Sequence, residues 1–272
     1  MAKHSEQSRM VSARVGSQGA LSGRTALVTG ASKNLGRAAA LALAEAGADV
    51  ILHAHRDRGG AEGVAREVEG AGVRAAVVVG DISTHQSVRE LMQGVVESVG
   101  GVDILVNNAA IRPNRPFLEL DEEAIRTVFG VNLFGAYFLA LEVVPKMIEK
   151  GWGRIINVSG VDGAIGGRLR THIAASKAGL IGFTKSLALE LAAHGITVNC
   201  IAPGPFQTTR TPEWFPGWES PAAWDQAHVE LMPVKRFGEP KEFGWACTFL
   251  ASPMAGYITG QTIHLNGGSY MP

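Results

Sequence analysis

The sequence predicts a doubly wound α/β fold, with a parallel sheet covered by helices on both faces, in a single domain. The 272 residues are 46% hydrophobic and include 34 glycines, and this length allows one large domain with a full core. Short β-branched runs alternate with longer helical patterns, which is typical of doubly wound folds. The strands are continuous apolar runs, which indicates burial on both faces and therefore a parallel sheet.

The elements are expected in regular order. The first strand is "TALVTG" (25–30), and an alanine- and leucine-rich helix follows over residues 36–47. Further strands are expected at 49–54, 74–81, 102–109, 153–160 and 195–204, and two long helices near 121–150 and 174–194. No linker or repeat interrupts the chain after the first twenty residues. We therefore expect one domain over 21–272, preceded by a flexible polar extension over 1–20.

Composition narrows the possible partners. Lysine plus arginine equals aspartate plus glutamate at 25 each, so no net field favours nucleic acid or an anionic membrane. No apolar run reaches the length of a membrane span, and the N-terminus lacks the apolar core of a secretory signal. We expect a cytoplasmic protein without a membrane or nucleic-acid partner. Cys200 and Cys247 are expected to be buried thiols rather than a disulfide, and no metal site is expected.

A glycine turn joins the first strand to the first helix. In "TGASKNLGR" (29–37), Gly30 allows a sharp turn and Gly36 allows the helix to pack closely on the strand. The free N–H groups and the positive end of the helix favour a pyrophosphate. The alternative for this segment alone is an ordinary tight turn.

Several motifs together resemble those of the short-chain dehydrogenase/reductase family, over nearly the whole chain after residue 20. The family turn is matched with Asn34 in place of its usual middle glycine, and asparagine tolerates left-handed backbone. The resemblance implies a Rossmann-type oxidoreductase that binds a nicotinamide dinucleotide and a small-molecule substrate. It implies cofactor contacts at Gly30, Ser32, Lys33, Asn34, Leu35 and Gly36, at Asp81 and Ile82 ("GDIS"), at Asn108 and Ala109 ("NNAA"), at Lys177, and at Pro203, Gly204, Phe206 and Thr208 ("PGPFQT").

The end of the second strand indicates the cofactor. An NAD enzyme places an acid there for the ribose 2′-hydroxyl, but the matching residue is Ala54. Lys33, His55 and Arg56 lie near enough in the pattern to bind a 2′-phosphate. We therefore expect NADP(H) in preference to NAD(H). The alternative is that these three are solvated surface charges.

The catalytic positions depart from the family pattern. Its members use a serine, a tyrosine, a lysine and an asparagine, and an ungapped match places Gly160 and Ile173 at the serine and tyrosine positions. Lys177 and Asn132 keep the other two roles. The match is supported by the helical spacing, because Ile173 and Lys177 share one otherwise apolar stripe, from which the lysine is expected to reach a cleft. The alternative is a lysine that extends along the helix to water.

Other polar groups near these positions are candidate replacements. Asp162 could lie near a substrate, or it could be a loop or cap carboxylate. His172 is a candidate acid or a plain first-turn histidine, pointing roughly 100° round the helix from Ile173. Ser159, one residue early on a strand, is expected to face away. Without the tyrosine, acid–base help worth about 10²–10⁴ in rate is lost.

Three interpretations of such a site remain open. Another group or the substrate itself supplies the proton, or hydride goes to a conjugated C=C bond or an iminium. In the third, the chain is a non-redox enzyme or a catalytically inactive nucleotide-binding subunit.

The substrate side and the assembly are predicted more coarsely. Residues about 205–235 fall where the family has its substrate lid, and the three tryptophans and phenylalanine of 209–226 suit an apolar or ring-shaped substrate, or simply pack the insertion. Arg112 and Arg115 are placed near the mouth of the site. The two long helices are apolar on more than one face, so each needs a further partner. The resemblance implies that these helices form dimers and tetramers, so we expect a homotetramer, with a dimer as the second possibility.

Overall fold

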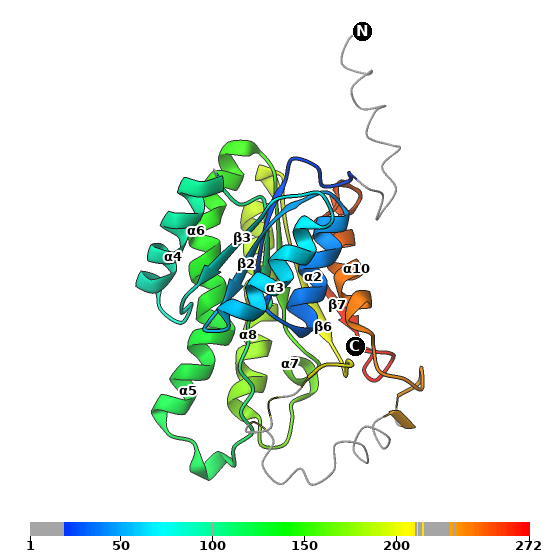
Figure 1. Ribbon diagram of the computed structural model, residues 1–272. Helices are drawn as coiled ribbons and strands as arrows, with labels where there is room; N and C mark the ends of the chain where they lie inside the picture. The colour runs from blue at the N-terminus through cyan, green and yellow to red at the C-terminus, as the bar shows by residue number, and fades with distance from the viewer. Residues whose placement is uncertain (1–18, 100, 210, 212–213, 215–228, 231) are drawn as a thin grey trace.

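A seven-stranded parallel sheet forms the centre of the molecule (Figure 1). The computed structural model describes residues 19–272 except 100, 210, 212–213, 215–228 and 231. The strands are β1 (Thr25–Thr29), β2 (Asp49–Ala54), β3 (Ala75–Val79), β4 (Ile104–Asn107), β5 (Gly153–Val158), β6 (Ile196–Pro203) and β7 (Thr262–Leu265). Each neighbouring pair is parallel. The predicted fold class is confirmed.

The strand order identifies the edge where a ligand binds. The order is β3-β2-β1-β4-β5-β6-β7, so the chain moves outward from β1 and then returns to place β4 beside it. In such sheets ligands bind outside the carboxyl ends of the strands, at the point where the order reverses. That point lies between β1 and β4.

Helices cover both faces of the sheet. The residues of α2 (Asn34–Glu45), α3 (Arg58–Glu69) and α10 (Pro240–Ala251) build one core cluster. The residues of α4 (His85–Val99), α6 (Gly135–Lys150) and α8 (Thr171–Leu191) build the other. Short elements complete the described chain: η2 (Phe117–Glu119), α5 (Glu122–Phe129), η3 (Gly130–Phe134), α7 (Asp162–Ile165), η4 (Ala192–His194) and η6 (Pro253–Ala255).

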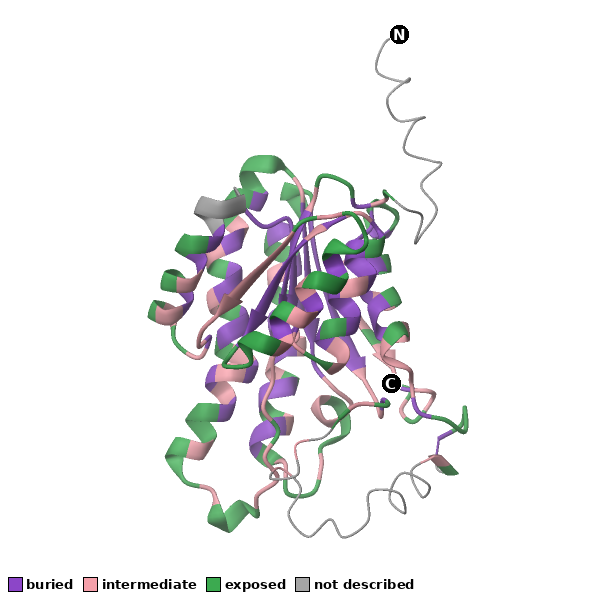
Figure 2. Ribbon diagram, in the orientation of Figure 1, coloured by how far each residue is buried: buried purple, intermediate pink, exposed green. Residues whose placement is uncertain are grey.

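The continuous apolar strands have the burial expected of a doubly covered sheet. Every residue of β1, β4 and β5 is buried, and the central strands are almost wholly purple in Figure 2. Burial on both faces removes the alternation of apolar and polar residues that a half-exposed strand would show.

The long helix expected at 121–150 is not regular throughout. It runs as α5, a π-helical turn (η3) and α6, and Asn132 lies inside the π turn. A Cβ added at Gly135 would lie 3.0 Å from the carbonyl oxygen of Ile82, so the helix passes very close to the segment after β3. Single π turns inside helices are frequent at functional sites.

This helix is also long and apolar. Over Glu122–Lys150 it is the one helix of the described chain whose length and composition would allow it to cross a membrane. Its residues Leu139, Val143 and Met147 are buried in the core beneath the sheet. Packing therefore accounts for much of its apolar content.

Candidate cofactor and active site

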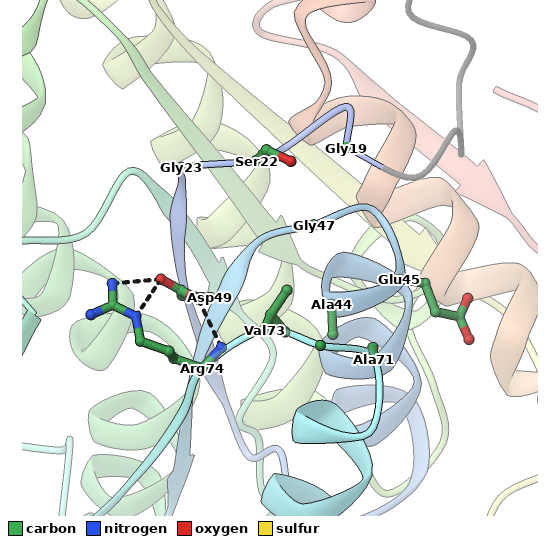
Figure 3. A pocket seen from close by; sticks show the side chains of 11 residues that line it. Gly19, Ser22, Gly23, Ala44, Glu45, Gly47, Asp49, Ala71, Val73 and Arg74 are labelled. Carbon is green, nitrogen blue, oxygen red and sulfur yellow. Dashed lines mark hydrogen bonds and ion pairs between the residues drawn. The ribbon is translucent and has the colours of Figure 1, made fainter.

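The candidate residues gather at the carboxyl edge of the sheet. Gly30 follows β1, Asp81 follows β3, Asn108 follows β4 and Gly160 follows β5. A cavity of about 490 Å³ lies instead at the opposite edge, among the turns that precede β1, β2 and β3 (Figure 3). Asp49 and Arg74 close part of it with an ion pair at 2.6 Å. Its place at the amino ends of the strands separates it from the candidate site.

The glycine turn has the close approaches that the sequence predicted. Gly30 has a φ of +63°, and a Cβ there would lie 3.1 Å from the Cα of Ala109. A Cβ at Gly36 would overlap the carbonyl oxygen of Gly30. The Asn108 amide donates to the carbonyl oxygens of Thr29 and Gly30 at 2.8 and 3.2 Å, which fixes the turn against β4.

The start of α2 is suited to an anion. The side chain of the N-cap residue, Lys33, makes no capping hydrogen bond to α2 among the described residues, and the first turn of α2 contains no acidic residue. Lys33 is exposed, while Ser32, Asn34 and Leu35 are partly buried beside the turn. Free N–H groups at a positive helix end bind phosphate groups well, so the turn fits a pyrophosphate.

His53 is a member of this site that sequence reasoning missed. Its ring is buried in β2, where Nε2 lies 3.0 Å from the carbonyl oxygen of Gly80 and Nδ1 lies 3.4 Å from the backbone N–H of Gly30. With Nε2 as donor and Nδ1 as acceptor, a neutral ring joins the glycine turn to the end of β3. Burial lowers the pKa of His53, which favours that neutral form. A histidine inside the apolar run "DVILHA" was the available signal.

The ends of β2 and β3 carry the residues expected around the adenosine. Ala54 is buried, and His55 and Arg56 are exposed just beyond it. Asp57 accepts the backbone N–H of Gly60 at 3.0 Å as the N-cap of α3.

Asp81 and Ile82 form the next part of this wall. Partial burial opposes ionisation of Asp81, but hydrogen bonds from Ser83 at 2.6 and 2.9 Å bring its pKa below the usual value. Ile82 is buried beside Gly135. A carboxylate and an apolar side chain therefore lie together after β3.

Lys177 is buried on α8 and held by the adjoining strand. Its Nζ donates to the carbonyl oxygen of Val158 at 2.6 Å, and Ser159 Oγ donates to the carbonyl oxygen of Lys177 at 2.8 Å. Burial, followed by the charge of Arg112, lowers the pKa of Lys177 to about 7. Ser159 is thus directed at α8, where its hydroxyl serves as a structural link.

Two buried amides that the sequence did not single out hold α8 in place. Asn107 donates to Asn157 Oδ1 at 2.8 Å, and Asn157 donates to Thr184 Oγ1 at 2.9 Å. This chain of hydrogen bonds runs from β4 through β5 to α8. It fixes the helix that carries Lys177 relative to the carboxyl edge of the sheet.

Gly160 and Ile173, expected at the family's serine and tyrosine positions, differ in the space around them. Ile173 is fully buried one helical turn before Lys177, so this position is filled by an aliphatic side chain. A Cβ at Gly160 would meet, among the described residues, only the carbonyl oxygen of Pro203 at 4.0 Å. That position has room for a larger side chain.

Asn132 connects three parts of the site. Its carboxamide accepts from Ile111 N at 2.8 Å and donates to Ile111 O at 3.0 Å and to Ser176 Oγ at 3.2 Å. It therefore fixes the loop after β4 against α8.

Asp162 is the first residue of α7, and its carboxylate already has a partner. It forms an ion pair with Arg170 at 2.8 Å, and Arg170 Nε also donates to Asn114 Oδ1 at 2.9 Å. The Arg115 backbone N–H donates to Leu169 O at 2.9 Å. The two loops that flank the candidate substrate side are therefore bound to each other.

His172 lies in the first turn of α8, which begins at Thr171, three residues before the expected start. The ring is buried, close to the backbone of Pro113. Nδ1 has no hydrogen-bond partner among the described residues. Burial lowers the pKa of His172, with the nearby Arg115 acting in the same direction.

The loop after β6 forms the remaining wall. Pro203 accepts the Val161 N–H at 3.2 Å, and Gly204 donates to Leu265 O at 3.0 Å. Phe206 is buried edge-on against Phe243, and Thr208 Oγ1 lies 3.4 Å from Phe206 O. Of the three tryptophans and one phenylalanine of 209–226, only Trp214 lies within the described residues.

This arrangement defines a class of protein. A parallel sheet whose order reverses beside a glycine turn and an uncapped helix start is the architecture of dinucleotide-binding oxidoreductases. Comparison with known proteins agrees: the family described as enoyl-(acyl carrier protein) reductase matches residues 30–270. The chain belongs to the short-chain dehydrogenase/reductase family, whose members are NAD(P)-dependent oxidoreductases.

Individual relatives cover nearly the whole chain. The 3-oxoacyl-acyl-carrier-protein reductase FabG of Staphylococcus epidermidis is 40% identical over 91% of this chain and 99% of its own length. The L-rhamnose 1-dehydrogenase (NAD(P)(+)) of Sphingomonas sp. is 37% identical over 92% and 98%. A solved structure assigned as a short-chain alcohol dehydrogenase from Sinorhizobium meliloti superposes with a TM-score of 0.86 at 38% identity, over 94% and 98%.

Proposed function

We propose that this protein is an NADP(H)-dependent oxidoreductase with a non-standard active site, in which Gly160 and Ile173 stand at the family's serine and tyrosine positions. Its substrate is a small apolar or aromatic carbonyl, enone or iminium compound. The observation that carries the proposal is the pairing of a complete dinucleotide turn with a fully buried Ile173, one helical turn before Lys177.

The preference for NADP(H) is supported by the end of β2. The residue that would carry the acid is the buried Ala54, and Asp57 is engaged as the cap of α3. His55 and Arg56 are exposed just beyond that end, and Lys33 is exposed at the start of α2. A 2′-phosphate would meet positive charge there, whereas a bare ribose hydroxyl would lack its usual carboxylate.

The cofactor, when bound, supplies or accepts a hydride at its nicotinamide. Lys177 would bind the adjoining ribose through its Nζ, which now donates to the carbonyl oxygen of Val158, and Asn132 holds the loop after β4 in position. The loop from Pro203 to Thr208 would contact the nicotinamide end. These residues bind and orient the reactants without supplying the phenol of the family mechanism.

Asp162 and His172 are the candidate groups for proton transfer. Asp162 is committed to Arg170, so its more direct role is to position that arginine. His172 Nδ1 has no hydrogen-bond partner among the described residues, and burial lowers the pKa of the ring, which favours its neutral form and makes it a poor proton donor. This set favours hydride transfer to a conjugated C=C bond or an iminium, where no alkoxide needs immediate protonation.

The second candidate function is that of a non-redox enzyme or an inactive nucleotide-binding subunit. It is favoured by the same buried Ile173, because an aliphatic side chain has replaced the expected acid. The deciding experiment follows NADPH consumption with a panel of ketones, enones and cyclic iminium ions, with Lys177→Met as the control. Turnover of any enone or iminium substrate supports the oxidoreductase, whereas tight NADPH binding without turnover supports the second function.

We also propose that the protein is a cytoplasmic homotetramer. On α6 and the adjoining turn, Phe134, Tyr137, Leu141 and Ile148 form an exposed apolar stripe with helical spacing. A second exposed apolar patch comprises Trp245 and Phe249, four residues apart on α10. Two separate patches provide two kinds of interface, which a tetramer with crossed two-fold axes requires.

A further inference from the structure

The side chain of Asn34 connects two walls of the candidate cofactor cleft. Its Oδ1 accepts from the backbone N–H of Thr209 at 2.9 Å, and its Nδ2 donates to the carbonyl oxygen of Thr209 at 2.9 Å. Asn34 opens α2 at the glycine turn, whereas Thr209 lies in the loop after β6, 175 residues later. Two reciprocal hydrogen bonds fix both the distance and the orientation of the Thr209 peptide.

The backbone at Asn34 shows why this residue type matters. Its φ is +52°, a left-handed conformation that glycine adopts most readily and asparagine tolerates among the other residues. A glycine would therefore keep the turn but would have no carboxamide. The side chain contributes a contact that the turn itself does not require.

The contact lies beside the groups expected to hold the cofactor. On one side are Gly30 and the uncapped start of α2, which fit a pyrophosphate. On the other side is Thr208, the neighbour of Thr209, whose hydroxyl makes one long bond, to Phe206 O at 3.4 Å. The Asn34 amide thus holds the Thr208–Thr209 backbone against the phosphate-binding turn.

We propose that Asn34 is a positioning residue for the cofactor: its carboxamide orders the Thr208–Thr209 backbone over the bound dinucleotide and slows dinucleotide release. This inference rests on the proposed dinucleotide-binding function. A loop held in its binding conformation loses less conformational freedom when the ligand binds. Release must also break both hydrogen bonds if the loop is to move away.

The test compares variants by stopped-flow measurement of NADPH dissociation from the full-length protein, with excess NADP⁺ as the competitor. Asn34→Gly keeps the left-handed turn and removes both bonds, so the dissociation rate is expected to rise about tenfold. If product release limits turnover, both kcat and the KM for NADPH rise in this variant. A variant that is merely less stable would not show a higher kcat.

Thr209 offers a matched control because it uses only its backbone. Thr209→Ala keeps both bonds and is expected to match the wild type. Thr209→Pro removes the N–H donor and is expected to speed release, and combining it with Asn34→Gly should add little to the single change. A melting temperature for each variant verifies folding.

The outcomes separate this inference from the function beneath it. If the wild type does not bind NADPH, both are overturned. If it binds NADPH but Asn34→Gly releases it at a rate within about twofold of the wild type, only the role of Asn34 is overturned. Release from Thr209→Ala as fast as from Asn34→Gly would also overturn it.

Discussion

Lys177 Nζ lies 2.6 Å from the carbonyl oxygen of Val158, two residues before Gly160 in the chain. Burial, followed by the charge of Arg112, lowers the pKa of this amine to about 7, although the carboxylate of Asp162 acts in the opposite direction. The residue that holds the cofactor ribose in the family is therefore a titrating group near neutral pH.

The first prediction concerns pH and stability. The folded pKa of Lys177 is about 7, below its ordinary value of 10.5, so the protonated form prefers the unfolded chain. Stability is lowest below the folded pKa, where both states are protonated, and it rises between about pH 7 and about pH 10 as only the unfolded state stays protonated. The rise is at most about 1.4 kcal/mol per pH unit for one proton.

Urea unfolding at several pH values measures this contribution. Lys177→Met should have a flatter profile than the wild type over that window, and Lys185→Met, which removes an exposed lysine of the same helix, should keep the wild-type slope. Because burial also lowers the pKa of His53, only the difference between variants is assigned to Lys177. Parallel profiles for wild type and Lys177→Met would refute the buried, titrating amine.

The second prediction concerns cofactor choice. NADPH should bind more tightly than NADH, because Arg56 is exposed just beyond β2, Lys33 is exposed at the start of α2, and Ala54 stands where an NAD enzyme has an acid. The double change Lys33→Met with Arg56→Met should weaken NADPH binding about tenfold and leave NADH within about twofold, since only the phosphate ester meets these charges. Fluorescence titration measures both affinities.

Arg58 provides the control for this experiment. It lies two residues beyond Arg56 but forms an ion pair with Glu62 along α3, so Arg58→Met should leave both affinities unchanged. Tighter binding of NADH than of NADPH by the wild type would contradict the assignment.

The fold could be predicted from sequence because its determinants are local and repetitive. The strands β1, β4 and β5 have uninterrupted apolar centres (ALV, ILV and II) without the alternation of a half-exposed strand, so burial on both faces follows from the pattern alone. The π turn at Asn132 could not be predicted in this way. It depends on the close approach of Gly130 and Gly135 to the segment after β3, which is a tertiary contact.

The candidate site was predictable in part for a similar reason. The glycine turn has a fixed spacing in the chain, whereas His53 gains its role only because β1 and β3 flank β2 in the sheet. The Asn34–Thr209 contact joins residues 175 positions apart, and no local pattern encodes it. Nor could the ion pair of Asp162 with Arg170 be separated from a free carboxylate by sequence alone.

The third prediction concerns assembly. Leu141→Glu places a charge in the exposed stripe on α6, and Trp245→Glu places one in the second patch. If each patch forms one interface of a homotetramer, either change should yield dimers and the combination monomers, because a buried unpaired carboxylate strongly disfavours association. Light scattering at micromolar concentration measures the mass.

Leu118 serves as the control for assembly. It is 94% exposed but lies in η2, outside both patches, so Leu118→Glu should leave the mass unchanged. A monomeric wild type would refute the tetramer, and so would an unchanged mass in the double variant.

The fourth prediction concerns the two replaced catalytic positions. If Gly160 and Ile173 occupy the serine and tyrosine positions, the wild type should reduce simple ketones poorly while still binding NADP(H). Ile173→Tyr with Gly160→Ser should then raise reduction of a generic aromatic ketone by about 10²–10⁴, the usual contribution of a positioned acid. Steady-state kcat/KM on acetophenone measures the gain.

The burial around each position decides how this result is interpreted. Gly160 has open space for a serine, but Ile173 is completely enclosed, so the longer tyrosine has to displace its neighbours. Gly160→Ser alone is therefore the folding control, with little expected gain. Adding Lys177→Met to the double variant should abolish the activity, because a tyrosine acid needs the adjacent ammonium to lower its pKa. Robust ketone reduction by the wild type, unaffected by His172→Ala or Asp162→Asn, would show that a different residue performs the chemistry.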